Sequence, residues 1–298
     1  MIDEKKFLSD LQSDNADTRF AAWRAAGDTS PGVIPELGKI ASSSDPGVAK
    51  AGREALTSLT HTVGKDVNAP NRAGVVQGLL ALAGDGNALP VRVHAVRLLS
   101  NIGGDDAVPG VAKLLSNAHL REEAVYALEQ IPGEASIDAI VAACKTAPDD
   151  FKPRLLAALG HRRSAKGMPL CVEAFKSPNA GVVVAAIKAA GRIGAEISPT
   201  PQMPNMAKLT PFQQAEVMDA MLRYADAMAA GGNAADAMRL YRMAVNSPAP
   251  HLQCAGAIGM AKIGTAEAAS AILPLTKSGN KQVKIVAQNA WKSMAAGK

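Results

Sequence analysis

Apolar and polar residues alternate along this chain in a sequence pattern that recurs about every 30 residues, a period typical of stacked helical repeats. We call this pattern the repeated phrase. The clearest copy runs over residues 89–103, where Val, Leu and Ile return every three or four positions before a glycine. A second apolar run over 106–115 follows directly. Apolar residues at these spacings indicate the buried stripe of an amphipathic helix. The phrase therefore predicts two helices joined by a short turn, with an Ile-Gly or Leu-Gly stop after the first.

The same phrase can be followed through six successive units between residues 14 and 195. An Asp, Asn or Ser turn opens most units, and a proline often follows it, as expected at a helix start. The predicted helix pairs are 18–26 with 31–40, 48–59 with 73–82, and 89–102 with 108–115, and the later units run over 117–145, 148–176 and 177–194. An arginine recurs in the first helix, at Arg92, Arg121 and Arg154, but the sixth unit has apolar residues there.

The register breaks over 198–210, because the segment Ser-Pro-Thr-Pro-Gln-Met-Pro cannot continue a helix. A longer helical pair is predicted at 211–229 and 234–245, and the phrase resumes at 250–264, 266–276 and 281–294. We therefore expect an N-terminal array over 1–197, the proline-rich break over 198–210 and a C-terminal part over 211–298, all in one continuous solenoid. Trp23 and Trp291 lie near the two ends, where terminal repeats must shield the core from solvent, and we expect them to do so.

Paired helices with Ile-Gly or Leu-Gly stops, an arginine in the first helix and an Ala-Val-Pro opening of the second resemble HEAT repeats. Over 14–195 and 249–294 the phrase resembles the short bacterial type first noted in phycobilin lyases. Residues 211–248 resemble a tetratricopeptide hairpin, with Ala237, Tyr241, Ala244 and Pro248 at the second-helix spacing but without the glycine of its first helix. The resemblance implies an all-α, right-handed α-solenoid (superhelix) of about seven to eight stacked antiparallel helical hairpins. It leaves the activity open, because the same repeat serves scaffolds, lyases and nucleic-acid binders.

Composition fits a soluble repeat protein with an aliphatic core. Hydrophobic residues make up 48% of the chain but aromatic residues only 3%. Cys144, Cys171 and Cys254 are odd in number and far apart, which predicts buried, reduced thiols and no disulfide framework. No segment approaches the ~20 apolar residues of a membrane-spanning helix. The first residues carry no apolar signal core, so we expect a cytoplasmic protein, although a leader removed earlier would leave no trace here.

Nothing in the sequence marks a catalytic, metal or cofactor site. The five histidines, His61, His94, His119, His161 and His251, are scattered and are not spaced as metal ligands with cysteine. There is no Gly-x-Ser-x-Gly elbow and no phosphate-binding loop. The acidic pairs Asp105-Asp106, Glu122-Glu123 and Asp149-Asp150 stand at predicted helix starts, where carboxylates cap free amides and complement the helix dipole. We therefore expect no enzyme activity, no metal and no cofactor.

A scaffold that binds a protein or peptide along the concave face made by the second helices is the favoured function. A pre-formed extended surface of this kind binds with little ordering cost. The candidate contact residues, taken from those helices, are Lys39, Gln77, Lys113, Lys145, Glu173 and Lys176.

The charge distribution suggests an alternative. Between residues 151 and 194 the chain has eight Lys and Arg residues and a single acid, Glu173. Successive repeats align equivalent positions, so these residues can form a stripe that binds an acidic protein, a phosphate or a nucleic-acid backbone. The candidates are Lys152, Arg154, His161, Arg162, Arg163, Lys166, Lys188 and Arg192. A solvated cationic face explains the same charges, and few aromatic residues are available to stack on bases, which disfavours nucleic acid. A lyase or chaperone for a cofactor protein ranks lower, since no cluster of polar residues marks a pocket.

Overall fold

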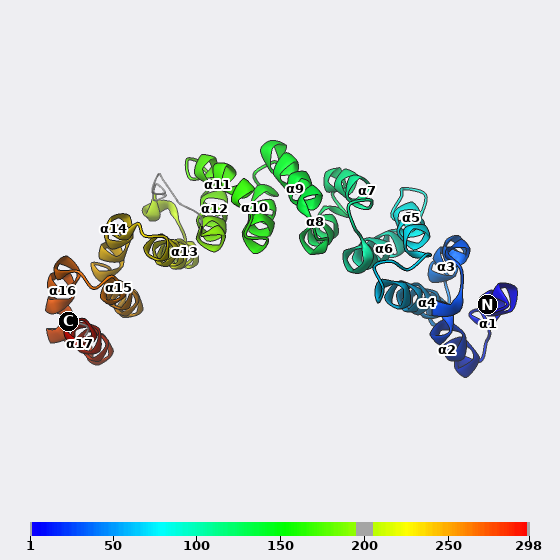
Figure 1. Ribbon diagram of the computed structural model, residues 1–298, viewed down its shortest axis with the longest axis horizontal. Helices are drawn as coiled ribbons and strands as arrows, with labels where there is room; N and C mark the ends of the chain where they lie inside the picture. Colours follow the sequence, from blue (N-terminus) through cyan, green and yellow to red (C-terminus); the bar gives the residue numbers. More distant parts are fainter. Residues whose placement is uncertain (1, 195–204, 297–298) are drawn as a thin grey trace. The chain divides into compact units, whose positions relative to one another are not determined.

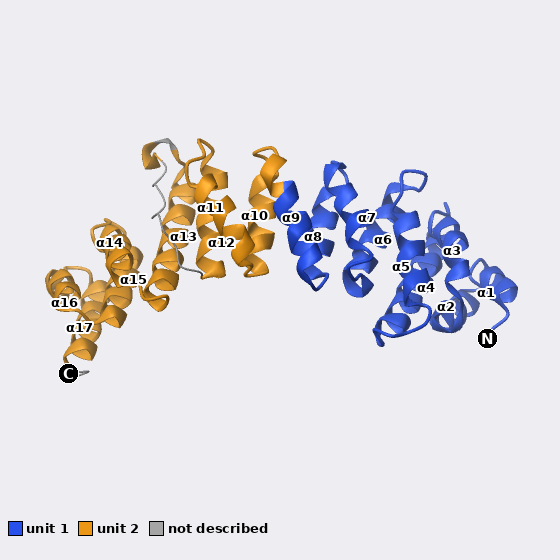
Figure 2. Cartoon of the chain, turned by 45° about the horizontal axis from the view of Figure 1, so that its top comes forward, with its two compact units in different colours: residues 1–143 blue, residues 144–298 orange. Residues whose placement is uncertain are grey.

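The structure is a computed structural model that describes residues 2–194 and 205–296. Every regular element in these two stretches is a helix, so the predicted all-α class is confirmed. The chain divides into two compact units, Met1–Ala143 and Cys144–Lys298 (Figure 2). The proline-rich break predicted over 198–210 falls within the second unit, and its residues 198–204 lie outside the described residues.

The first unit is a stack of helical hairpins (Figure 1). Its helices are α1 (Glu4–Asp10), α2 (Ala16–Arg24), α3 (Ile34–Ala41), α4 (Pro46–Gly64), α5 (Arg72–Leu82), α6 (Leu89–Ile102), α7 (Val108–Lys113), α8 (Arg121–Gln130) and α9 (Glu134–Thr146). The first helices of successive hairpins, α2, α4, α6 and α8, pack side by side in one layer. The second helices α3, α5 and α7 lie on the other side of that layer. This sequential hairpin packing is that of an α-solenoid.

The second unit begins in the last turn of α9 and has the same kind of hairpin stacking within itself. Its helices are α10 (Lys152–His161), α11 (Met168–Ala174), α12 (Ala180–Ile193), α13 (Pro211–Ala230), α14 (Ala234–Val245), α15 (Pro250–Ile263), α16 (Ala266–Ile272) and α17 (Lys281–Ala296). Helices α10, α12 and α13 pack successively side by side, and α15 packs beside α17. Short 3-10 turns join several helices: η1 (Ala26–Asp28), η2 (Pro31–Val33), η3 (Leu114–Ser116), η4 (Ala165–Gly167), η5 (Met206–Lys208) and η6 (Leu273–Lys277).

Helix starts and stops follow the predicted residues closely. The Asp45 carboxylate accepts a hydrogen bond of 2.8 Å from the Val48 amide at the start of α4. Ile-Gly stops end α6, α12 and α15. Gly194 and Gly264, which follow α12 and α15, have φ angles of 66° and 73°, a left-handed conformation that favours glycine. Gly194 and Gly264 therefore have a local conformational cause as stop residues, whereas Gly103 after α6 is extended, with a φ of −61°.

Two features differ from the prediction. The second helices α3, α7 and α16 are shorter than expected, and α7 and α16 pass into the 3-10 turns η3 and η6 rather than continuing as α-helix. Helix α1 was not predicted, because it carries no copy of the repeated phrase. It packs on α2, and the Glu4 carboxylate accepts a hydrogen bond of 2.7 Å from the Ser30 amide.

The recurring arginine closes the turn between successive hairpins. Arg92, at the start of α6, donates from Nε to the Ala83 carbonyl at 3.0 Å and from Nη2 to Asp85 at 2.5 Å. Ala83 is the C-terminal cap of α5, the second helix of the preceding hairpin. Arg19 of α2 makes the equivalent bond to the Ser13 carbonyl at 2.6 Å. The arginine thus satisfies a carbonyl that a helix end or turn leaves without a partner.

Aliphatic side chains build the core, and the three cysteines are buried as predicted. The two tryptophans behave differently from each other. Trp23 is half-buried and packs edge-to-face on Phe20, with ring centroids 5.0 Å apart. Trp291 is 41% exposed, so it covers the end of the core less completely than expected.

Candidate functional site

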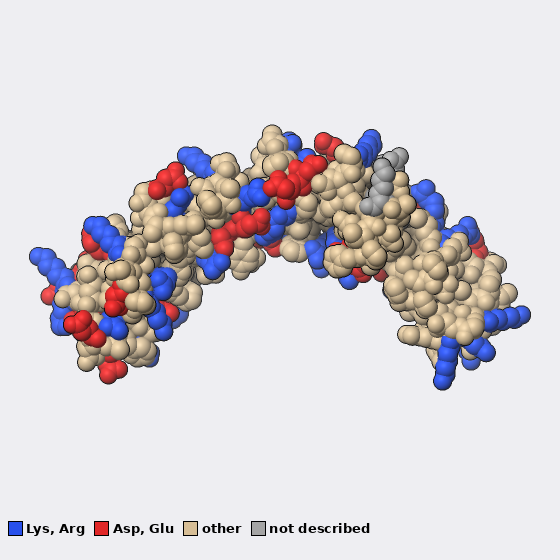
Figure 3. Space-filling view, turned by 180° about the vertical axis from the view of Figure 1, so that it is seen from behind, with Lys and Arg blue, Asp and Glu red and all other residues tan. Residues whose placement is uncertain are grey.

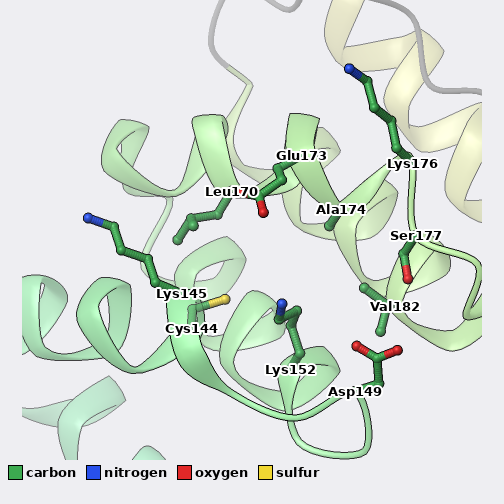
Figure 4. Close-up of a pocket in the computed structure, with 10 residues that line it drawn as sticks. All are labelled: Cys144, Lys145, Asp149, Lys152, Leu170, Glu173, Ala174, Lys176, Ser177 and Val182. Atoms are coloured by element: carbon green, nitrogen blue, oxygen red, sulfur yellow. The ribbon is translucent and has the colours of Figure 1, made fainter.

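Within the second unit, the last turn of α9 and helices α10 to α12 surround a cavity of about 230 Å³ (Figure 4). We call it the lysine cavity. It is lined by Cys144, Lys145, Asp149, Lys152, Leu170, Glu173, Ala174, Lys176, Ser177 and Val182. Three of the predicted partner contacts, Lys145, Glu173 and Lys176, meet there with Lys152 from the predicted anion-binding set. The structure thus joins residues that the sequence assigns to separate functions.

The repeat geometry brings these residues together. Helices α10 and α12 run in the same direction, and Gly160 near the end of α10 lies against Ala189 near the end of α12. Helices α9 and α11 therefore end where α10 and α12 begin. Lys145 in the last turn of α9 and Lys176 just after α11 occupy equivalent places in successive hairpins. Because successive hairpins stack, Lys145 and Lys176 lie near each other at one edge of the stack.

The charges of the lysine cavity are not neutralised by one another. The Lys152 ammonium and the Glu173 and Asp149 carboxylates point inwards, whereas Lys145 and Lys176 extend from the rim (Figure 4). Within the described part of the chain, none of these five side chains forms an ion pair. Three cations and two anions are thus available to a ligand, on an apolar floor of Leu170, Ala174 and Val182.

Cys144 is a lining residue without the chemistry of a nucleophile. Its side chain is buried, and burial raises the pKa of the thiol from 9.0 to about 11. The Lys152 charge opposes this rise in pKa, and the Glu173 charge adds to it. Because the thiolate is the reactive species, a thiol with this pKa is inert at neutral pH. The described residues also contain no group of three or more side chains placed to hold a metal ion.

Asp149 was expected to cap the start of α10, and this prediction is wrong. The N-terminal cap of α10 is Phe151, without a side-chain cap hydrogen bond, and Asp149 lines the lysine cavity instead. Cys144, Asp149 and Ser177 are the polar lining residues that the sequence analysis missed. The only signal in the sequence was that these residues lie at the junctions between successive repeats.

The basic run over 151–194 is divided between the two ends of its helices. Lys152 stands at the start of α10, whereas His161 and Arg162 stand at its other end, about 15 Å away at 1.5 Å per residue. Lys188 of α12 forms an ion pair with Glu216 of α13. The linear count of charge omits this acid, because α13 lies beyond the run in sequence. Arg154 lies in α10, Arg163 and Lys166 follow that helix, and Arg192 lies in the last turn of α12.

The remaining partner candidates lie in the first unit and are all exposed. Lys39 pairs with Glu36 at 2.6 Å on α3, Gln77 lies on α5, and Lys113 ends α7. Lys39, Lys113 and Lys145 each stand in the last turn of a second helix, where a cation complements the helix dipole. Their recurrence therefore has a structural cause in addition to any role in binding.

Stacked helical hairpins with aliphatic cores and capped inter-repeat turns define an all-α repeat protein. Residues 76–152 match the family model described as HEAT repeats. This stretch of the chain thus carries HEAT repeats, and the resemblance inferred from the repeated phrase is confirmed there.

Among solved structures, the chain is similar to Kap121p bound to Nup53p, with 13% sequence identity and a TM-score of 0.47. The match covers 97% of this chain and 41% of that chain, so this chain spans well under half the length of that protein. No curated protein sequence matches the chain. Among the described residues, no helix is both long and apolar enough to cross a membrane.

Proposed function

We propose that this protein is a non-catalytic scaffold that binds a protein or peptide, and that the lysine cavity anchors an acidic group of that partner. One observation carries the proposal: five charged side chains surround a single cavity, and none of them has an ion-pair partner in the described chain. Three of the five are lysines, so the cavity favours a ligand with net negative charge. Solenoids present surfaces of this kind for extended partners.

The position of the half-buried Lys152 gives the cavity its selectivity. Its ammonium points into the space, whereas Lys145 and Lys176 lie at the mouth (Figure 4). A carboxylate or phosphate group of the partner would contact Lys152 inside and pass between the other two cations. A hydrogen bond between charged groups is about twice as strong as one between neutral groups, so a single such contact can anchor the partner.

A photo-cross-linking experiment tests the proposal. A benzoylphenylalanine replaces the exposed Ala142 of α9, near the cavity, or the exposed Tyr126 of α8, on a first helix. In cells that produce the protein, we expect a distinct cross-linked protein from position 142. The purified partner should then bind at least tenfold more weakly to the triple variant Lys145→Glu, Lys152→Glu, Lys176→Glu.

A matched triple variant controls for net charge. Lys5→Glu, Lys50→Glu, Lys65→Glu makes the same change at exposed lysines elsewhere and should leave binding unchanged. Equal cross-linking from positions 142 and 126, or equal weakening by both triple variants, would refute the proposal. A steep dependence of duplex DNA binding on salt, starting from ~50 mM, would instead support the nucleic-acid alternative.

A further inference from the structure

A second surface, separate from the lysine cavity, lies on the C-terminal helices of the second unit. A groove of about 420 Å³ runs between α15 and α17. It is lined by Ile258, Ala261, Lys262, Val286, Asn289, Ala290 and Ser293. We call it the α15–α17 groove. Its walls are mostly apolar, and Ile258 is 46% exposed although its side chain is large and aliphatic.

Helix periodicity explains why apolar residues reach this surface. The α17 residues of the groove recur at spacings of three and four, so they form one stripe along the helix. Val283 and Ala287, on the adjoining stripe, are fully buried in the core of the unit. The groove is therefore an extension of the core that no described residue covers. Ile285 is likewise 48% exposed on the same helix.

The charges around the groove are almost all positive. Residues 250–296 contain five lysines and a single acid, Glu267. Glu267 already pairs with Arg242 of α14. Lys262 lines the groove, with Asp226 as a distant partner at 3.7 Å, and Lys281 and Lys292 lie on the neighbouring outer side of α17 by helical spacing. Figure 3 shows a broad uncharged surface bordered by Lys and Arg at this end of the second unit.

We propose that the α15–α17 groove docks an amphipathic helix of a partner protein, with apolar anchors facing the groove and acidic residues along its flanks. Val286 and Ser293 are seven residues apart, so the stripe spans about 10 Å, or two turns of a docked helix. Anchors at positions i, i+4 and i+7 match that length, which is the recognition mode of helix-in-groove complexes. The lysine rim then pairs with the acidic flanks and sets the choice of partner.

The test uses two fluorescein-labelled helical peptides of the same length with Leu at i, i+4 and i+7. One carries Glu at every flanking position, and the other carries Lys at those positions. By fluorescence anisotropy with the full chain, we expect the Glu peptide to bind at least tenfold more tightly than the Lys peptide. The variant Ile258→Asp should weaken the Glu peptide at least tenfold, and it is expected to fold because this side chain is half exposed.

Two controls separate this proposal from the others. Phe212→Asp changes an apolar side chain of the same unit that is 75% exposed, and it should leave binding unchanged. The lysine-cavity triple variant should also bind the Glu peptide normally, so this proposal and the proposed function can fail independently. Equal affinity for both peptides, or no effect of Ile258→Asp, overturns the proposal. A dimer in sedimentation analysis that Ile258→Asp dissolves overturns it too, because the occupant is then a second copy.

Discussion

Gly259 lies where α15 presses most closely on α14, and its replacement by alanine gives a sharp test of this packing. A Cβ at this position would collide with Cε1 and Cζ of Tyr241 and lie 2.6 Å from its Cδ1. The Tyr241 ring is 1% exposed, and its hydroxyl donates a 2.7 Å hydrogen bond to Asp226 of α13. The ring thus has little space to move away, and three helices depend on its position.

The competing free energies favour destabilisation. Alanine in place of glycine inside a helix gains about 1 kcal/mol from helix propensity. Extra volume in a packed core costs about 1–3 kcal/mol, and a hydrogen bond to a charged group that is lost costs about 1.5–3 kcal/mol. With part of that bond lost, we expect Gly259→Ala to lower the free energy of unfolding of the second unit by about 2 kcal/mol.

Gly64→Ala is the matched control. Gly64 ends α4, and a Cβ there would meet nothing within 4 Å, so this variant should gain about 0.5–1 kcal/mol. Urea unfolding is followed by the fluorescence of Trp291 alone in a Trp23→Phe background, and of Trp23 alone in a Trp291→Phe background. The reasoning is refuted if Gly259→Ala is neutral or stabilising. It is also refuted if Tyr241→Leu, which removes the colliding ring carbons, leaves the cost of Gly259→Ala unchanged.

Three further predictions concern one hydrogen bond of the first unit and the response of each unit to pH. Arg92→Ala should destabilise the first unit by about 1–3 kcal/mol in urea unfolding, because the Ala83 carbonyl loses its partner, and Arg92→Gln should recover part of this loss. Burial raises the pKa of Cys144 to about 11 and of Cys171 to about 12, so the second unit should lose stability as pH rises above 9.0, where unfolded thiols ionise. Burial lowers the pKa of His94 below 6.5, so the first unit should instead lose stability as pH falls below that value. Cys→Ser variants or His94→Gln that leave these pH profiles unchanged would contradict the assignments.

Much of the helical layout could be predicted from local sequence. The expected helices at 89–102 and 234–245 agree with α6 (Leu89–Ile102) and α14 (Ala234–Val245). Both have a strong apolar period and clear boundary residues. The short second helices were less predictable: α7 and α11 are too short to be stable from propensity alone and depend on packing for their ends. Helix α1 depends on contacts with α2 that no repeat pattern encodes.

The candidate site was predictable only in part, because its residues meet through the ends of four helices. Lys145, Glu173 and Lys176 belong to one set of candidates from the second helices, and the structure brings these three, but not Lys39, Gln77 and Lys113, to one cavity. Lys152 joins them only because α10 begins where α9 and α11 end. The basic run over 151–194, by contrast, suggested a stripe of positive charge. Counting charges within that run leaves out Glu216 of α13, which pairs with Lys188.

Recurrence in this chain identifies structural residues more reliably than functional ones. The arginine that marks the repeat binds inter-repeat carbonyls at Arg19 and Arg92, and Gln253 of α15 makes the equivalent bond to the Ser247 carbonyl at 2.9 Å. Lysines at the ends of second helices have a similar structural cause in the helix dipole. Charged residues without such a partner are therefore the informative ones. By this criterion Lys152 and Glu173, which line the lysine cavity and form no ion pair with a described residue, are the side chains that the proposed function assigns to partner contact.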